Sequence, residues 1–144
     1  MTRERVISAW IVGIVTLGLI AATVPSAQSQ AAKKTAIKIT QVPPYDAQGG
    51  PDKMVTIAGA ATGDNVKQYK VVIFVRTNTW YVQPYLASPY TSIADDGKWR
   101  TDTHLGAEYA ALLVKPSYIP PATTNTVPEI GDEVLAIDKQ PGRK

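Results

Sequence analysis

The sequence contains no cysteine and only one histidine, His104. The absence of cysteine excludes disulfide bonds, a thiolate zinc site and a cysteine nucleophile. A single histidine excludes a zinc site built from several histidines of one chain, and we expect neither a metal nor another cofactor. The length of 144 residues suits one domain. Without disulfides, that domain depends on its hydrophobic core for stability.

The chain also lacks a strong net charge, and its sequence predicts no amphipathic helix outside the N-terminal segment. The chain has 15 basic and 12 acidic residues, a net charge of +3, and its only basic clusters are Lys33–Lys34 and Arg143–Lys144. A nucleic-acid-binding protein usually carries a basic stripe, so we expect no nucleic-acid partner. No strand–turn–helix pattern is present that could carry a phosphate-binding or dinucleotide-binding loop.

Residues 1–32 form a membrane-targeting segment. Arg3 and Arg5 precede an uncharged run over residues 6–24, and Pro25, small residues and glutamines follow. This order is typical of a secretory signal. The run is longer than a usual signal core, however, and close to the ~20 residues that span a bilayer. A cleaved signal peptide and an uncleaved anchor both stay open, and the anchor is our working interpretation.

The basic residues ahead of the hydrophobic run predict the location of the rest of the chain. Such residues keep an N-terminus in the cytoplasm, which places everything after about Ser26 outside it. We therefore expect a domain on the outer face of a bacterial cytoplasmic membrane, in the periplasm or extracellular space. If the leader is cleaved, the domain is secreted.

The remainder reads as short strands separated by turns. Residues 36–42 and 53–61 alternate apolar and polar side chains, as half-buried strands do. Residues 69–77 form a run rich in β-branched residues, which predicts a central strand buried on both faces. The remaining strands are expected at residues 80–83, 98–105, 108–114 and 132–137, with a tight turn at Asp95-Asp96-Gly97.

These patterns predict an all-β protein. About seven strands suit an immunoglobulin-like β-sandwich, preceded by one N-terminal hydrophobic helix; an open barrel is the alternative. The sandwich would comprise residues 33–139 and the polar tail residues 140–144.

From Tyr69 onward the line "YKVVIFVRTNTWYVQPYLASPYTSIADDGKWRTDTHLGAEYAALLVKPSYIPP", with the preceding "VTIAGAATG", resembles a known module. It is a bacterial secreted module with a "WYVQP…P.T.I..DG.W" signature, often found with carbohydrate-active enzymes, lipoproteins and other cell-envelope proteins. The resemblance covers about half of the chain. It implies an extracytoplasmic β-sandwich accessory domain and no catalytic residue set.

Aromatic and proline residues supply the candidate contact sites. Neighbouring side chains of a strand point to opposite faces, so Trp80 and Tyr81 cannot both lie in a core if one sheet face is exposed. One interpretation is a platform for sugar rings or a partner protein; the other is that Trp80 and Trp99 pack the sandwich and the tyrosines cover its edge. The candidate binding residues are Trp80, Tyr81, Tyr85, Tyr90, Tyr118, Pro120 and Pro121.

Two further segments have alternative interpretations. The proline-rich residues 118–131 form either an extended contact arm or a crossover loop that lies along its own sandwich. His104 lies two residues from Asp102 on one strand face, but no Gly-x-Ser-x-Gly elbow accompanies them. We expect a solvent-facing or hydrogen-bonded histidine there, and a turn rather than a calcium site at Asp95 and Asp96.

These observations predict a non-catalytic, membrane-attached accessory subunit with a structural, protein-binding role. Its partners would be other subunits of a larger membrane or envelope assembly. The alternative is a secreted carbohydrate-binding module that binds cell-envelope or extracellular polysaccharide.

Overall fold

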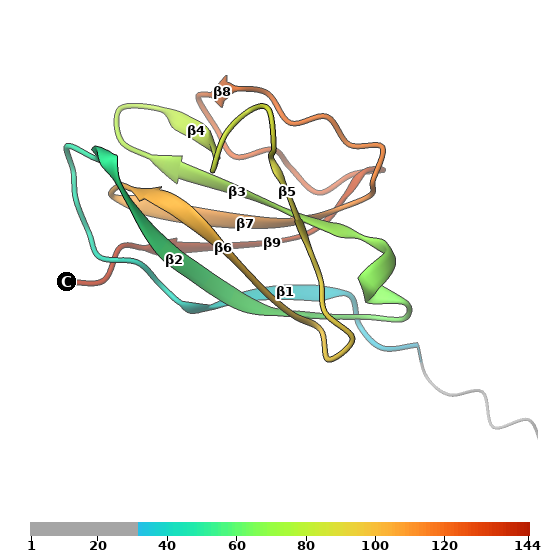
Figure 1. Ribbon diagram of the computed structural model, residues 1–144. Coiled ribbons are helices and arrows are strands. Elements are labelled where there is room, and N and C mark those ends of the chain that lie inside the picture. The colour runs from blue at the N-terminus through green and yellow to red at the C-terminus, as the bar shows by residue number, and fades with distance from the viewer. Residues whose placement is uncertain (1–31) are drawn as a thin grey trace, which may run out of the picture. The chain divides into compact units, whose positions relative to one another are not determined.

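The computed structural model describes residues 32–144, which form two antiparallel β-sheets packed as a sandwich (Figure 1). The predicted all-β class is confirmed. The expected N-terminal hydrophobic helix lies outside the described residues. Within residues 32–144, no helix has the length and apolar content needed to cross a bilayer.

The smaller sheet has three strands in the order β1-β2-β6, namely β1 (Ala36–Gln41), β2 (Gly50–Thr62) and β6 (Lys98–Leu105). The larger sheet has the order β8-β4-β3-β7-β9, with β5 also on β3. Its strands are β3 (Lys70–Arg76), β4 (Trp80–Gln83), β5 (Tyr90–Ser92), β7 (Glu108–Val114), β8 (Thr123–Thr124) and β9 (Val134–Pro141). One 3-10 turn, η1 (Val66–Gln68), links β2 to β3.

Seven of the nine strands in this part of the chain fall where the sequence pattern predicts them. The two that it does not predict, β5 and β8, have three and two residues and are held by pairing with β3 and β4. β9 continues to Pro141, and Arg143 donates its N–H to Pro43 at 2.9 Å. The segment expected as a polar tail over residues 140–144 therefore packs against the domain.

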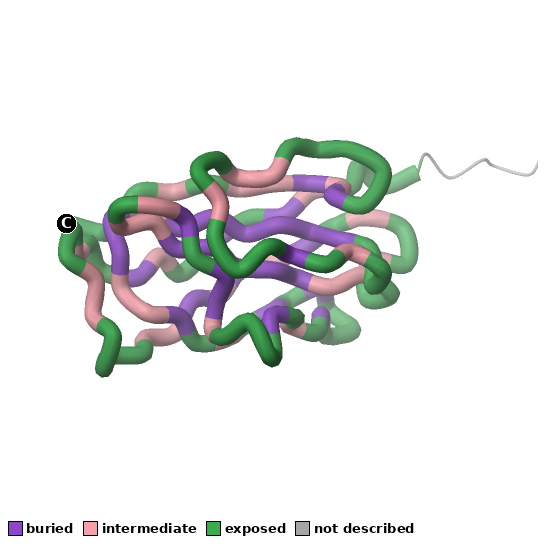
Figure 2. The backbone as a smooth tube through the Cα atoms, turned by 90° about the horizontal axis from the view of Figure 1, so that it is seen from above, coloured by how far each residue is buried: buried purple, intermediate pink, exposed green. Residues whose placement is uncertain are grey.

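β3 is buried on both faces, as its unbroken apolar run predicts. Val71, Ile73 and Val75 point into the inner cluster, which fills the space between the two sheets. Val72 and Phe74 point the other way, into the outer cluster on the far face of the larger sheet. Figure 2 shows the buried residues concentrated along the middle of the domain, while the connecting loops are exposed.

Residues 115–133 cover the outer cluster. This segment leaves β7, forms β8 beside β4, and returns to β9 along the same face (Figure 1). Tyr118 and Val127 pack against the outer cluster, and Pro120 is buried. Of the two interpretations of the proline-rich segment, the crossover loop lying along its own sandwich agrees with the structure.

Trp99 of β6 needs a glycine on the neighbouring strand. Its side chain is buried in the inner cluster and lies over Gly59 of β2, its partner in the sheet register. A Cβ atom at position 59 would lie 2.5 Å from the indole and 1.9 Å from the carbonyl oxygen of Lys38. Only glycine fits there, because both contacts are far shorter than van der Waals distance.

Tyr109 of β7 fastens one end of the sandwich. Its ring is fully buried; its hydroxyl donates to the carbonyl oxygen of Pro44 at 2.8 Å and accepts from the N–H of Gly106 at 3.0 Å. Gly106 must stay small, because a Cβ there would lie 2.6 Å from the carbonyl oxygen of Arg76. One phenol thus joins the β1–β2 connection to the β6–β7 turn.

We expect Tyr109→Phe to lower the free energy of unfolding by about 1–3 kcal/mol, because it leaves the Gly106 N–H and the Pro44 carbonyl without their partner. Urea denaturation of the full-length chain in mild detergent, followed by circular dichroism, measures the change. Tyr81→Phe is the matched control, since the Tyr81 hydroxyl bonds the exposed Asn78. Equal stability losses in the two variants would contradict the role given to Tyr109.

The stability of the fold should fall at alkaline pH. Burial raises the pKa of Tyr109, so the unfolded chain releases that proton at lower pH than the folded chain. The stability difference is fully present below the unfolded pKa of about 10 and is lost as pH rises through the folded value. Unfolding curves between pH 8 and 11 should show this loss, and Tyr109→Phe should reduce it. A loss of the same size in the variant would contradict this assignment.

Candidate functional site

The hollow with the most site-like lining is a groove between the two sheets, which we call the edge groove. It has a volume of about 520 Å³ and lies between β4 of the larger sheet and β6 of the smaller one. No Asp, Glu, Lys or Arg lines it. Its lining includes Val75, Tyr81, Gln83, Pro84, Leu86 and His104.

The alternation of β4 puts two kinds of side chain on its two faces. Trp80 and Val82 point into the outer cluster, which leaves Tyr81 and Gln83 on the face toward the smaller sheet. Trp80 is only 4% exposed, whereas Tyr81 is 37% exposed. The prediction that these two neighbours cannot both be core is confirmed, and Trp80 has no surface with which to bind a ligand.

Gln83 links the two sheets at the edge groove. Its Oε1 accepts a hydrogen bond from the backbone N–H of His104 at 2.8 Å and lies 2.8 Å from the ring Nδ1 of the same residue. Because the backbone N–H can only donate, the Gln83 atom it meets is the oxygen. Nδ1 therefore carries a proton and donates it to the same oxygen, which holds the imidazole in one orientation. His104 is hydrogen-bonded, as the sequence predicts.

Residues 84–89 form a loop that interrupts one edge of β3. β4 pairs with β3 up to Gln83, and β5 resumes on the same edge at Tyr90. Pro84 has no N–H with which to continue the ladder. Between the two strands the loop closes on itself, where the N–H of Ser88 donates to the Tyr85 carbonyl at 3.1 Å.

This loop presents large apolar side chains to solvent. Tyr85 and Leu86 are 57% and 56% exposed. The Tyr85 ring contacts the His104 ring edge-to-face, with centroids 5.8 Å apart and an interplanar angle of 78°. Since Gln83 holds His104, this contact orients Tyr85. Tyr81 and Leu86 line the edge groove, and Tyr85 lies beside it against His104; we call these three residues the aromatic rim.

The candidate residues from the sequence thus separate into two places. Tyr81 lines the edge groove, and Tyr85 lies beside the groove, against the His104 ring that also lines it. Tyr90 and Tyr118 lie over the other face of the larger sheet, where the Tyr90 hydroxyl donates to the Tyr118 carbonyl. Pro121 is exposed in the same segment. Tyr90 therefore helps to hold the crossover segment, residues 115–133, against the sheet. Burial, together with the negative charge of Glu133, raises the pKa of Tyr118.

Sequence reasoning missed Leu86 and the role of Gln83. Nothing in the sequence around Gln83 indicates that its side-chain amide bonds His104, which lies 21 residues further along the chain. Leu86 could have been suspected, because it is the one large aliphatic residue in a proline-flanked loop that has no strand pattern.

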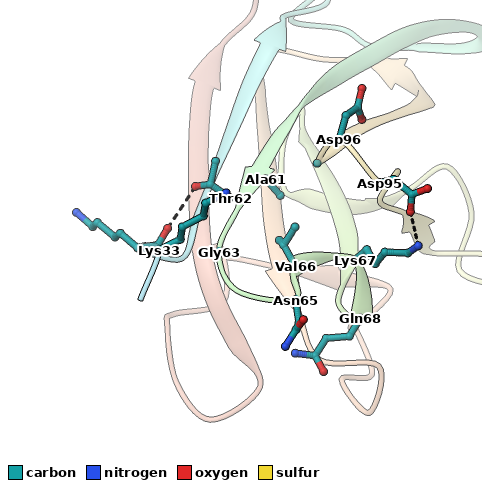
Figure 3. Close-up of a pocket in the computed structure, with 12 residues that line it drawn as sticks. Lys33, Ala61, Thr62, Gly63, Asn65, Val66, Lys67, Gln68, Asp95 and Asp96 are labelled. Atoms are coloured by element: carbon teal, nitrogen blue, oxygen red, sulfur yellow. Dashed lines mark hydrogen bonds and ion pairs between the residues drawn. The ribbon is translucent and has the colours of Figure 1, made fainter. Parts of the chain in front are cut away.

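A larger hollow of about 990 Å³ lies at the opposite end of the strands (Figure 3). Its charged groups are surface residues, and the pair Lys67–Asp95 is mostly exposed. The hydrogen bond from Lys67, with its positive charge, lowers the pKa of Asp95. Gly97 adopts φ +82° and its N–H donates to the Ala94 carbonyl, which confirms the predicted turn. Its greater volume does not make this hollow the better candidate site, because five of its lining residues are charged side chains, Lys33, Lys34, Lys67, Asp95 and Asp96, that lie in solvent.

The chemistry available at the edge groove is that of a binding site: an apolar floor, aromatic and aliphatic groups at the rim, and polar groups that already bond each other. Across residues 32–144, no three His, Asp or Glu side chains gather in a way that could hold a metal ion. No protein-family model, curated protein or solved structure matches this chain significantly. The resemblance of residues 69–121 to an accessory module stays a prediction from the residues.

We expect Gln83→Leu to lower the free energy of unfolding by about 1–2 kcal/mol, because the part-buried N–H of His104 loses its acceptor. The His104 ring should also lose its fixed orientation, which NMR of the ring protons detects. Gln68→Leu is the matched control, since Gln68 is an exposed glutamine of η1. If His104 keeps the same ring environment in Gln83→Leu, the proposed link is wrong.

Proposed function

We propose that this protein is a non-catalytic accessory subunit, held at the outer face of a membrane by its N-terminal segment. Its aromatic rim binds a partner protein of a larger membrane or envelope assembly. The observation that supports this most is the exposure of Tyr85 and Leu86 on a loop anchored at both ends. Large apolar side chains held in place on a rigid scaffold are typical of the residues that carry protein–protein binding energy.

The contacts that hold the loop support a role in binding rather than in core packing. The Tyr85 ring is already oriented by His104, which Gln83 holds in place. Little side-chain entropy of Tyr85 is therefore lost when a partner protein binds. The edge groove beside it carries no formal charge, which suits an apolar side chain of the partner protein.

We also propose that the sandwich is immunoglobulin-like, and the strand order supports this. The smaller sheet has the order β1-β2-β6, and the larger places β9, β7, β3 and β4 side by side. In the immunoglobulin family of sandwiches a tyrosine near the start of a strand bonds the backbone a few residues upstream. Tyr109 makes such a bond to Gly106. Domains of this kind commonly serve as binding modules of cell-surface proteins.

A second candidate function is carbohydrate binding. Tyr81, Gln83 and His104 line the edge groove, and the exposed ring of Tyr85 lies beside the groove against His104. Apolar surface with a few placed polar groups is also what small-ligand sites use. This candidate predicts retention of the isolated chain on a polysaccharide column.

The experiment that tests the proposal is purification of the tagged full-length chain from native membranes in mild detergent. We expect a stoichiometric partner protein, lost in the Tyr85→Ala/Leu86→Ala variant with unchanged melting, because both side chains are mostly exposed. Ile130→Ala is the matched control, since Ile130 is also exposed but lies outside the rim.

Three outcomes would contradict the proposal or one part of it. A partner that binds the double variant as well as the natural chain would place the interface elsewhere. A lone chain that polysaccharide retains and the double variant releases would favour the carbohydrate-binding candidate. A mature chain that begins near Gln28 or Gln30 in mass spectrometry would replace the membrane anchor by a cleaved signal.

A further inference from the structure

The exposed face of the smaller sheet carries a hollow whose floor is formed by two alanines. Ala58 and Ala60 lie on the middle strand β2, and the alternation of that strand turns them away from the buried side chains of Ile57 and Ala61. The hollow has a volume of about 660 Å³, and both alanines line it. Because an alanine side chain ends at Cβ, the side chains of the two neighbouring strands extend beyond this floor.

The sheet register places a nitrogen-bearing side chain on each side of both alanines. Two rows of paired residues cross β1, β2 and β6: Lys38, Ala60 and Lys98 in one row, and Gln41, Ala58 and Arg100 in the next. Paired residues of antiparallel strands point to the same face of the sheet, and the four flanking residues are all exposed. Three positive charges and one amide therefore surround the floor.

The three cations start close enough together to contact one bound group. Neighbouring strands lie about 4.8 Å apart, so the Cα atoms of Lys38 and Lys98 are roughly 10 Å apart across β2. Arg100 follows Lys98 by two residues, which is roughly 6.6 Å along β6. Long side chains that start at these separations can meet over the two alanines.

The positive charges around the hollow are not neutralised by the described part of the chain. The two ion pairs within residues 32–144 involve none of the three cations, and no Asp or Glu lines the hollow. The carboxylates of Asp96 and Asp102, which flank the cations along the chain, accept from the Lys98 N–H at 3.0 Å and the Thr56 hydroxyl at 3.3 Å. The larger hollow of Figure 3 differs, because side chains of both signs line it.

We propose that this hollow binds a phosphate group, and we call it the phosphate hollow. A tetrahedral phosphate has enough oxygens to accept from two ammonium groups and a guanidinium at the same time, whereas a carboxylate has only two. The amide of Gln41 adds a neutral donor. The phosphate can belong to a small soluble ligand or to a phospholipid headgroup, since both present the same oxygens.

Phosphate binding here is independent of the function proposed above. The phosphate hollow lies on the outward face of the smaller sheet, and it shares no lining residue with the edge groove. Either proposal can fail while the other holds, because the two are tested with different variants and different ligands.

Titration with inorganic phosphate tests the proposal. The full-length chain in a phosphate-free, uncharged detergent is titrated with sodium phosphate, and with sodium chloride at equal ionic strength, while NMR follows the backbone amides. We expect saturable shifts at Ala58 and Ala60 with phosphate alone. Lys38→Gln and Lys98→Gln should each weaken binding roughly threefold, as expected for one exposed charge contact. Lys139→Gln is the matched control, since Lys139 is an exposed lysine of β9 in the other sheet.

Two further variants separate a defined site from a general attraction of anions. Ala60→Leu fills the floor without changing the charge and should abolish the saturable shift at Ala58, whereas a general attraction would survive it. Asp102→Asn removes a negative charge two residues from Arg100 and should tighten binding. Circular dichroism confirms that each variant is folded, and the lysine variants test the site even if Ala60→Leu is not.

A second titration distinguishes the two sources of the phosphate group. Short-chain phosphatidic acid that binds more tightly than inorganic phosphate, and that Lys98→Gln weakens, would assign a lipid headgroup; equal affinity would assign a soluble phosphate ligand. The proposal is overturned if neither ligand saturates, if chloride gives the same shifts, or if the lysine variants bind phosphate as tightly as the natural chain.

Discussion

The structure depends on the burial of β3 on both faces. All five residues from Val71 to Val75 are buried and apolar. Because alternate side chains point to opposite faces of the sheet, packing against the smaller sheet alone would bury only the side chains of one face. The smaller sheet covers Val71, Ile73 and Val75, and residues 115–133 cover Val72 and Phe74. The long proline-rich segment is therefore a structural requirement, since a bare outer face would expose a large apolar surface.

Strand edges are the second constraint on this sandwich. The smaller sheet ends at β1 and β6, and a side chain of the larger sheet bonds an edge amide at each end. Asp138 accepts from the N–H of Ile39 at 2.7 Å, and Gln83 accepts from that of His104 at 2.8 Å. These bonds tie the two sheets together, and the second also orients the aromatic rim.

Much of the fold was predictable, and less of the site. Alternation and β-branched runs predict most strands, because the side-chain period of a strand is a local property. β5 and β8 are too short to show an alternating sequence pattern. Their strand conformation depends on pairing with β3 and β4 rather than on local residue preference. The sequence left open which aromatic candidates are buried and which are exposed. Their burial and their separation into the rim and the crossover face followed from the two faces of the larger sheet.

The sequence by itself determined the all-β class, the doubly buried central strand, the Asp-Gly turn and the prediction of a membrane-targeting leader. These depend on periodicity, turn chemistry and hydrophobic length, which act over a few neighbouring residues. Only the tertiary structure decided that Trp80 is core, that Tyr85 stands exposed against His104, and that Lys38, Lys98 and Arg100 surround two alanines of β2. Each depends on which strands lie together, and strand pairing joins residues far apart in the chain through burial that no local pattern encodes.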